Sequence, residues 1–129
     1  MITCFTSGIK LSVESAFRDI IEEEGIKRYI FAYRLRLVNE SGFTVALKRC
    51  HWYLAETLGK PRSMTGRPPY DEASRVLEPG DGMEYVARCD IGSDMGVMFG
   101  RYEVERCIDG ETITLEIPRF DLLSPYRFN

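Results

Sequence analysis

A proline–glycine turn followed by regular alternation constrains the fold of this chain more than any other sequence feature. Pro79-Gly80 suits the two central positions of a type II turn, because proline fixes φ and glycine accepts a positive φ. From Met83 to Asp90 the residues then alternate with a period of two. This period indicates a strand with one buried face.

Similar alternation recurs along the chain. Its longest example runs from Tyr29 to Leu37, and the opposite face of that strand carries Arg34 and Arg36, so we expect that face to be at least partly solvated. We expect the first strand of the fold at Ile9–Val13. Further strands are expected at 43–47, 51–54, 96–107 and 111–117.

Turn signals separate these strands. Asn39–Gly42 is a turn cluster, and Asp109-Gly110 predicts a two-residue hairpin. We interpret Phe17–Gly25 as a loop and Gly59–Pro69 as a long connection. Several short strands and no convincing helix predict one all-β domain over 1–129, folded as an antiparallel sandwich.

Composition limits the partners of the chain. A net charge of −3 predicts no bulk attraction to nucleic acid or to anionic membranes. The segment Met1–Phe5 lacks the basic region and apolar core of a signal peptide, so we expect a cytoplasmic protein. We therefore expect the four cysteines, which contain no Cys-x-x-Cys pair, to be free buried thiols.

We find no residue pattern that predicts an enzyme, a cofactor or a metal centre. His51 is the single histidine, and its neighbour Cys50 should point to the opposite face of the strand, which opposes a Cys–His pair. Glu103 and Glu105 share a strand face but are expected to be solvated. We interpret His51 as structural and Trp52 as a core residue.

Two charged segments remain as candidate binding sites. Lys60, Arg62 and Arg67 lie on a segment rich in proline and glycine, where they could receive a phosphate-type anion or an acidic partner surface. A merely solvated loop is the alternative. The acids of segment 19–24 could instead gather a divalent cation, which prefers oxygen ligands.

The chain resembles the ApaG family over nearly its whole length. The residues that carry the resemblance are the Val76–Tyr102 stretch, Tyr29-x-Phe31-x-Tyr33, His51-Trp52, and Ile117-Pro118-x-Phe120-x-Leu122. The resemblance implies an immunoglobulin or fibronectin type III-like β-sandwich. It implies no known chemistry, because the family has none established.

The resemblance also bears on a phosphate site. The family has a Gly-x-Gly-x-x-Gly segment before the Leu-x-Pro-Gly turn, and only Gly66 of that motif remains here. Pro68 and Pro69 remove backbone N–H donors that a phosphate cradle would use. This departure argues against an inherited nucleotide-binding site. Gly66, the one glycine retained, is grouped with Lys60, Arg62 and Arg67 as a candidate for binding an anion or a partner.

Related domains stand alone in bacteria and also occur in some F-box proteins and in a polymerase-delta-interacting protein. This distribution implies a small non-enzymatic module that binds another protein. Bacterial members are associated with cobalt resistance and magnesium efflux, which implies a role in divalent-cation homeostasis. We expect an unidentified protein partner, no nucleic acid or membrane, and a monomer or weak homodimer.

Overall fold

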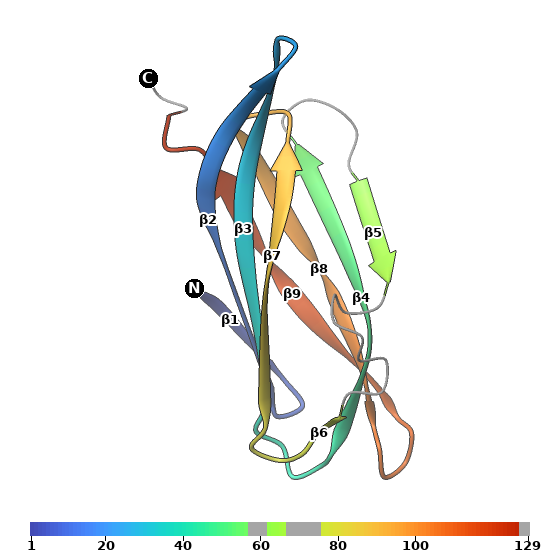
Figure 1. The fold of residues 1–129 in the computed structure, drawn as a ribbon. Coiled ribbons are helices and arrows are strands. Elements are labelled where there is room, and N and C mark those ends of the chain that lie inside the picture. Colours follow the sequence, from blue (N-terminus) through green and yellow to red (C-terminus); the bar gives the residue numbers. More distant parts are fainter. Residues whose placement is uncertain (57–61, 67–75, 127–129) are drawn as a thin grey trace.

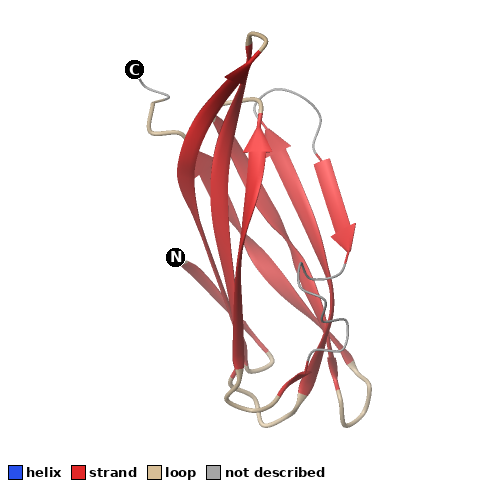
Figure 2. Ribbon diagram, in the orientation of Figure 1, coloured by secondary structure: helices blue, strands red, loops and turns tan. Residues whose placement is uncertain are grey.

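The computed structural model describes residues 1–56, 62–66 and 76–126, with the backbone alone for 62–66. All regular structure in these ranges is β-strand, as Figure 2 shows. The strands are β1 (Ile2–Thr6), β2 (Ile9–Glu23), β3 (Ile26–Asn39), β4 (Val45–Glu56), β5 (Arg62–Gly66), β6 (Val76–Leu77), β7 (Gly82–Ile91), β8 (Met95–Arg106) and β9 (Thr112–Leu123).

The strands form two antiparallel sheets that pack as layers (Figure 1). Sheet A has the order β1-β2-β3-β7. Sheet B has the order β5-β4-β8-β9, and the short β6 pairs with the first residues of β4. Every pairing between described strands is antiparallel. The predicted all-β class and sandwich-like arrangement are therefore confirmed.

One apolar core lies between the sheets. Trp52 is buried, and its ring packs 5.0 Å from that of Tyr33 and 6.1 Å from that of Phe120. Alternate residues along β3, β7 and β8 are buried in the core or packed against it, which confirms the core positions expected in these strands. The largest fully buried side chains are Tyr102, Phe31, Ile9, Leu11, Leu35, Leu37, Leu47, Leu54, Leu77, Ile91, Met98 and Leu115.

The turns at one end of the sandwich follow the sequence signals. Gly80 has φ +91°, and the Asp81 N–H donates to the Glu78 carbonyl at 2.9 Å, as a type II turn requires. Asn39 is fully buried, and its side-chain amide donates to the carbonyls of Phe43 and Leu77. Asn39 thus ties the β3–β4 turn to β6.

The structure corrects four sequence interpretations. Ile9–Val13 is not the first strand, because β1 precedes it and pairs with it. Phe17–Gly25 is not a loop, since β2 continues to Glu23. The hairpin at Asp109-Gly110 is not a two-residue one, because the five residues 107–111 lie between β8 and β9. Part of the 59–69 connection is strand β5.

Candidate docking groove at the β2–β3 hairpin

The β2–β3 hairpin extends beyond the rest of sheet A. Its strands pair as far as Glu23 and Ile26, and Glu24 and Gly25 form the two-residue turn with φ values of 51° and 78°. Positive φ at both positions is the mark of a type I′ turn, whose twist matches that of paired strands. By contrast, the pairing of β3 with β7 ends at Tyr29 and Ile91.

A β-bulge sets which side chains of the hairpin point outward. The register of β2 against β3 shifts between Phe17 and Asp19, so Arg18 is an extra residue. Beyond this point Ile21 lies opposite Arg28, and Glu23 lies opposite Ile26. The bulge therefore reverses the odd–even alternation of β2 before the hairpin tip.

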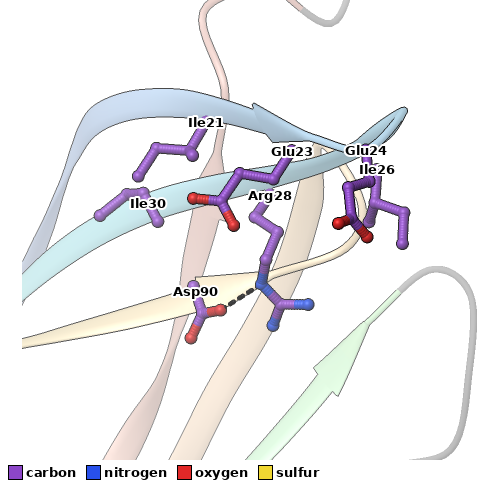
Figure 3. Close-up of a pocket in the computed structure, with 7 residues that line it drawn as sticks. All are labelled: Ile21, Glu23, Glu24, Ile26, Arg28, Ile30 and Asp90. Atoms are coloured by element: carbon purple, nitrogen blue, oxygen red, sulfur yellow. Dashed lines mark hydrogen bonds and ion pairs between the residues drawn. The ribbon is translucent and has the colours of Figure 1, made fainter.

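These side chains line a pocket of about 710 Å³ on the outer face of sheet A (Figure 3). Phe31 enters the core, so its neighbour Ile30, and with it Arg28 and Ile26, face the opposite way. The lining residues are Ile21, Glu23, Glu24, Ile26, Arg28, Ile30 and Asp90. A smaller hollow of about 210 Å³ adjoins it and shares three of these residues, adding Arg88 and Cys89.

The pocket combines exposed apolar surface with an acidic rim. Ile21 and Ile26 are 43% and 62% exposed. Arg28 donates from Nε to the Asp90 carboxylate, and Figure 3 shows this pair among the residues that line the pocket. No ion pair joins Glu23 or Glu24 to another residue in the described ranges. The groove is therefore apolar with a net negative rim.

Among the described residues, none that lines this groove comes from the basic segment predicted from sequence. Lys60 and Arg67 lie outside the described residues. Arg62 and Gly66 are the ends of β5, opposite Leu54 and Cys50 of β4. Arg62 thus stands on a strand rather than a loop, and anion or partner binding at 60–67 stays a prediction.

The acids of segment 19–24 do not converge on one point. Strand alternation separates Glu22 from Glu23, and no group of three or more His, Cys, Asp or Glu side chains in the described part of the chain could hold a metal ion. Carboxylates of Glu23 and Glu24 do line the groove, as part of a surface rather than a coordination shell.

His51 and Cys50 lie on opposite faces of β4, as expected. His51 Nε2 is 3.7 Å from Glu103 Oε1 on the outer face of sheet B, where Arg49 also approaches Glu103. Lys48 pairs with Glu105 at 3.0 Å. The two glutamates of β8 thus meet cations of β4 rather than a shared ligand.

Burial makes the Cys50 thiol a poor nucleophile. Desolvation raises its pKa from 9.0 to about 11, although hydrogen bonds with Tyr102 and Tyr85 act to lower it. Desolvation likewise raises the pKa of Tyr33 to about 12. The four cysteines are unbridged, but Cys107 is exposed, so the expectation that all are buried is wrong.

Sequence reasoning missed the groove because Ile21 lies in the segment interpreted as a loop, and Ile26 precedes the strand predicted from Tyr29. Ile21 and Ile30 share one face only because the bulge at Arg18 reverses the alternation of β2. Gly25 was the available signal, since glycine readily adopts the positive φ that a two-residue hairpin turn requires. Asp90 joins the groove through β7, which no local pattern could reveal.

Comparison with known proteins shows the family. The ApaG domain model matches residues 22–106, which begin at the hairpin tip and end with β8. The chain belongs to the ApaG family. Curated relatives named Protein ApaG are 34% identical, one from Paramagnetospirillum magneticum over 94% of this chain and 92% of its own length, and one from Brucella canis over 97% and 95%.

Solved structures share the ApaG fold. An X-ray structure from structural genomics has a TM-score of 0.84 at 21% identity, covering 93% of this chain and 89% of its own. A Bordetella pertussis protein named ApaA has a TM-score of 0.75 at 22% identity, covering 93% and 98%. In the described ranges of this ApaG-family chain, no helix is long and apolar enough to span a membrane.

Proposed function

We propose that this protein is a small non-enzymatic interaction module that holds a protein partner in the groove of the β2–β3 hairpin. The observation that carries the proposal is the exposure of Ile21 and Ile26 inside a pocket of about 710 Å³. Apolar side chains gathered in an exposed hollow with a charged rim commonly mark a contact surface.

Membership of the family supports the wider setting of this proposal. The association of bacterial members with cobalt resistance and magnesium efflux favours a partner in divalent-cation homeostasis. The same proposal includes a fibronectin type III-like sandwich, a cytoplasmic location, and a monomer or weak homodimer. Domains of this architecture bind through loops and sheet faces, which is consistent with an exposed hairpin.

A pair of matched variants tests the proposal. Ile21→Ser with Ile26→Ser removes exposed apolar surface of the groove, whereas Phe5→Ser with Ile108→Ser removes apolar surface elsewhere that is even more exposed. Tagged versions of all three proteins are used to capture partners from lysate of the source cells, with quantitative mass spectrometry. We expect to find proteins that the parent and the control variant capture but that the groove variant does not.

Equal capture by the groove variant would remove the groove as the contact surface. A ligand-binding role would show itself differently, because a ligand that binds the folded state raises Tm by mass action. A specific rise in Tm with phosphate, polyphosphate, Mg²⁺ or Co²⁺ would favour the small-ligand alternative. An interaction module is expected to give no response to that panel.

A further inference from the structure

We infer that the partner of this groove is an extended, basic polypeptide segment that adds as a strand to the open edge of β3 at Ile26–Arg28. The inference rests on the proposed function and names the chemistry of the partner. Strand addition is a common mode of peptide recognition, in which main-chain hydrogen bonds give affinity and alternate side chains give specificity.

The edge exists because the two neighbours of β3 differ in length. On one side β2 pairs with β3 as far as Ile26, while on the other side β7 ends at Ile91, opposite Tyr29. Within the described ranges, no strand pairs with Ile26–Arg28 on the β7 side. Glu23 and Ile26 flank the two-residue turn as a hydrogen-bonded pair, so Ile26 and Arg28 direct their N–H and C=O groups to β2. Lys27 therefore directs its N–H and C=O groups toward the open side.

The chain after β7 is held away from this edge. The Ser93 hydroxyl donates to the carbonyl of Met95 at 2.9 Å, and Ser93 is buried. The carbonyl of Asp94 accepts the N–H of Ser124, also at 2.9 Å. These bonds tie the β7–β8 turn to the end of β9, so β7 cannot simply lengthen to cover Ile26–Arg28.

The side chains beside the edge suit a strand that alternates apolar and basic residues. Ile26, Arg28 and Ile30 share one face of β3 and line the groove, so every second side chain of an added strand would enter it. The rim carries three acids (Glu23, Glu24 and Asp90) against the single base Arg28, a net charge of −2 (1 − 3). Opposite charges on the partner would steer its approach.

Defined peptides and the full-length, ¹⁵N-labelled protein test the inference. The probes are an acetylated, amidated Lys-Val hexapeptide, its Glu-Val counterpart, and the Lys-Val peptide with a central proline. With the Lys-Val peptide, chemical shifts should change at residues 26–28, and the Lys27 amide should exchange up to about tenfold more slowly. The proline and Glu-Val peptides should bind more weakly.

Charge variants provide the matched control. Glu23→Lys with Glu24→Lys should weaken binding of the Lys-Val peptide by about tenfold at low salt, since two favourable pairings become repulsive. Glu78→Lys with Glu116→Lys changes the net charge equally at exposed sites outside the groove, and should leave binding nearly unchanged. Equal losses in both variants would show attraction to net charge alone and would overturn the inference.

Other outcomes separate this inference from the proposed function. Shift changes in the groove without slower amide exchange would mean side-chain contact, which overturns strand addition but leaves the groove as an interaction site. Slower exchange that grows with protein concentration, with doubling of mass in sedimentation, would identify a second copy as the occupant and overturn the basic partner. Equal capture from lysate by the parent and by the Ile21→Ser, Ile26→Ser variant would instead contradict the proposed function itself.

Discussion

At Gly100, β8 passes so close to β4 that a β-carbon built there would lie 2.0 Å from the carbonyl oxygen of His51. The contact is with backbone of a paired strand, which cannot rotate away as a side chain could. Trp52, the residue opposite Gly100, belongs to the core. The glycine is therefore required by the distance between two strands.

We expect Gly100→Ala to lower the free energy of unfolding by about 3 kcal/mol or more, because β4 and β8 must separate to admit the methyl group. Urea unfolding measures the effect. Gly92→Ala is the matched control, since nothing lies within 4 Å of a β-carbon there, and it should change stability by less than about 0.5 kcal/mol. Equal urea midpoints for the two variants would contradict the requirement for glycine at position 100.

The thiols should differ sharply in reactivity. Cys107 is exposed in the β8–β9 hairpin, whereas Cys50 is buried with its pKa raised to about 11. At pH 8 only about one Cys50 in a thousand would be a thiolate. Iodoacetamide on native protein should therefore modify Cys107 well before Cys50, as peptide mapping would show, and Cys107→Ser should remove the fast phase.

The same raised pKa sets the direction of a pH effect on stability. The folded state favours the neutral Cys50 thiol, so this contribution is complete below pH 9 and is lost as pH rises through about 11. Cys50→Ala should make the decline of stability between pH 9 and 11 shallower. A decline of unchanged steepness would show that Cys50 does not cause it.

Among the elements, the bulges explain both the successes and the failures of sequence reasoning. Alternation located the strands around Phe31 and Met83 because both run without an inserted residue where they cross the core. It failed where registers shift, after Phe17 in β2 and after Leu47 in β4. One extra residue changes which side chains face inward, and no local pattern marks it.

The groove was beyond sequence reasoning for a related reason. Its acids were noticed as a charged run, but their grouping with Ile26 and Asp90 depends on strand pairing across sheet A. Asp90 is 62 residues from Arg28 (90 − 28) along the chain, and the two meet in an ion pair. Such proximity is decided by topology rather than by composition.

Deletion of Arg18 tests the role of the bulge in β2. The pairs on either side, Phe17 with Phe31 and Asp19 with Ile30, become consecutive if Arg18 is removed. We therefore expect the deletion variant to fold with Ile21 still opposite Arg28, and with a straighter hairpin because the bulge adds bend and twist. Cross-strand NOEs report the pairing directly.

A cross-strand NOE between Ile21 and Tyr29 in the deletion variant would show that the register slips instead. Ala16 deletion is a suitable comparison, because it removes a residue from the regular part of β2, where Ala16 pairs with Ala32. That change shifts one section of the strand against β3 and should destabilise the domain markedly more than the loss of Arg18.

For the molecule as a whole, the two sheets share a single core and should unfold together. Trp52 reports on the centre of this core, while far-UV circular dichroism reports on the strands of both sheets. We expect the two unfolding curves to coincide, as for a single cooperative domain. The tryptophan fluorescence of the native protein should have the emission maximum of a buried indole. Different unfolding midpoints by fluorescence and by circular dichroism would show that one sheet unfolds before the other.

The interleaved strand order has a consequence for synthesis on the ribosome. The partner of β3 in sheet A is β7, and Tyr29 is made 62 residues (91 − 29) before the Ile91 that pairs with it. At ordinary translation rates this interval lasts about 3–12 s. During it, β3 lacks its partner β7, and sheet B is incomplete because β8 and β9 are made after Ile91. Early strands of this protein therefore need shelter from self-association until the end of the chain has emerged.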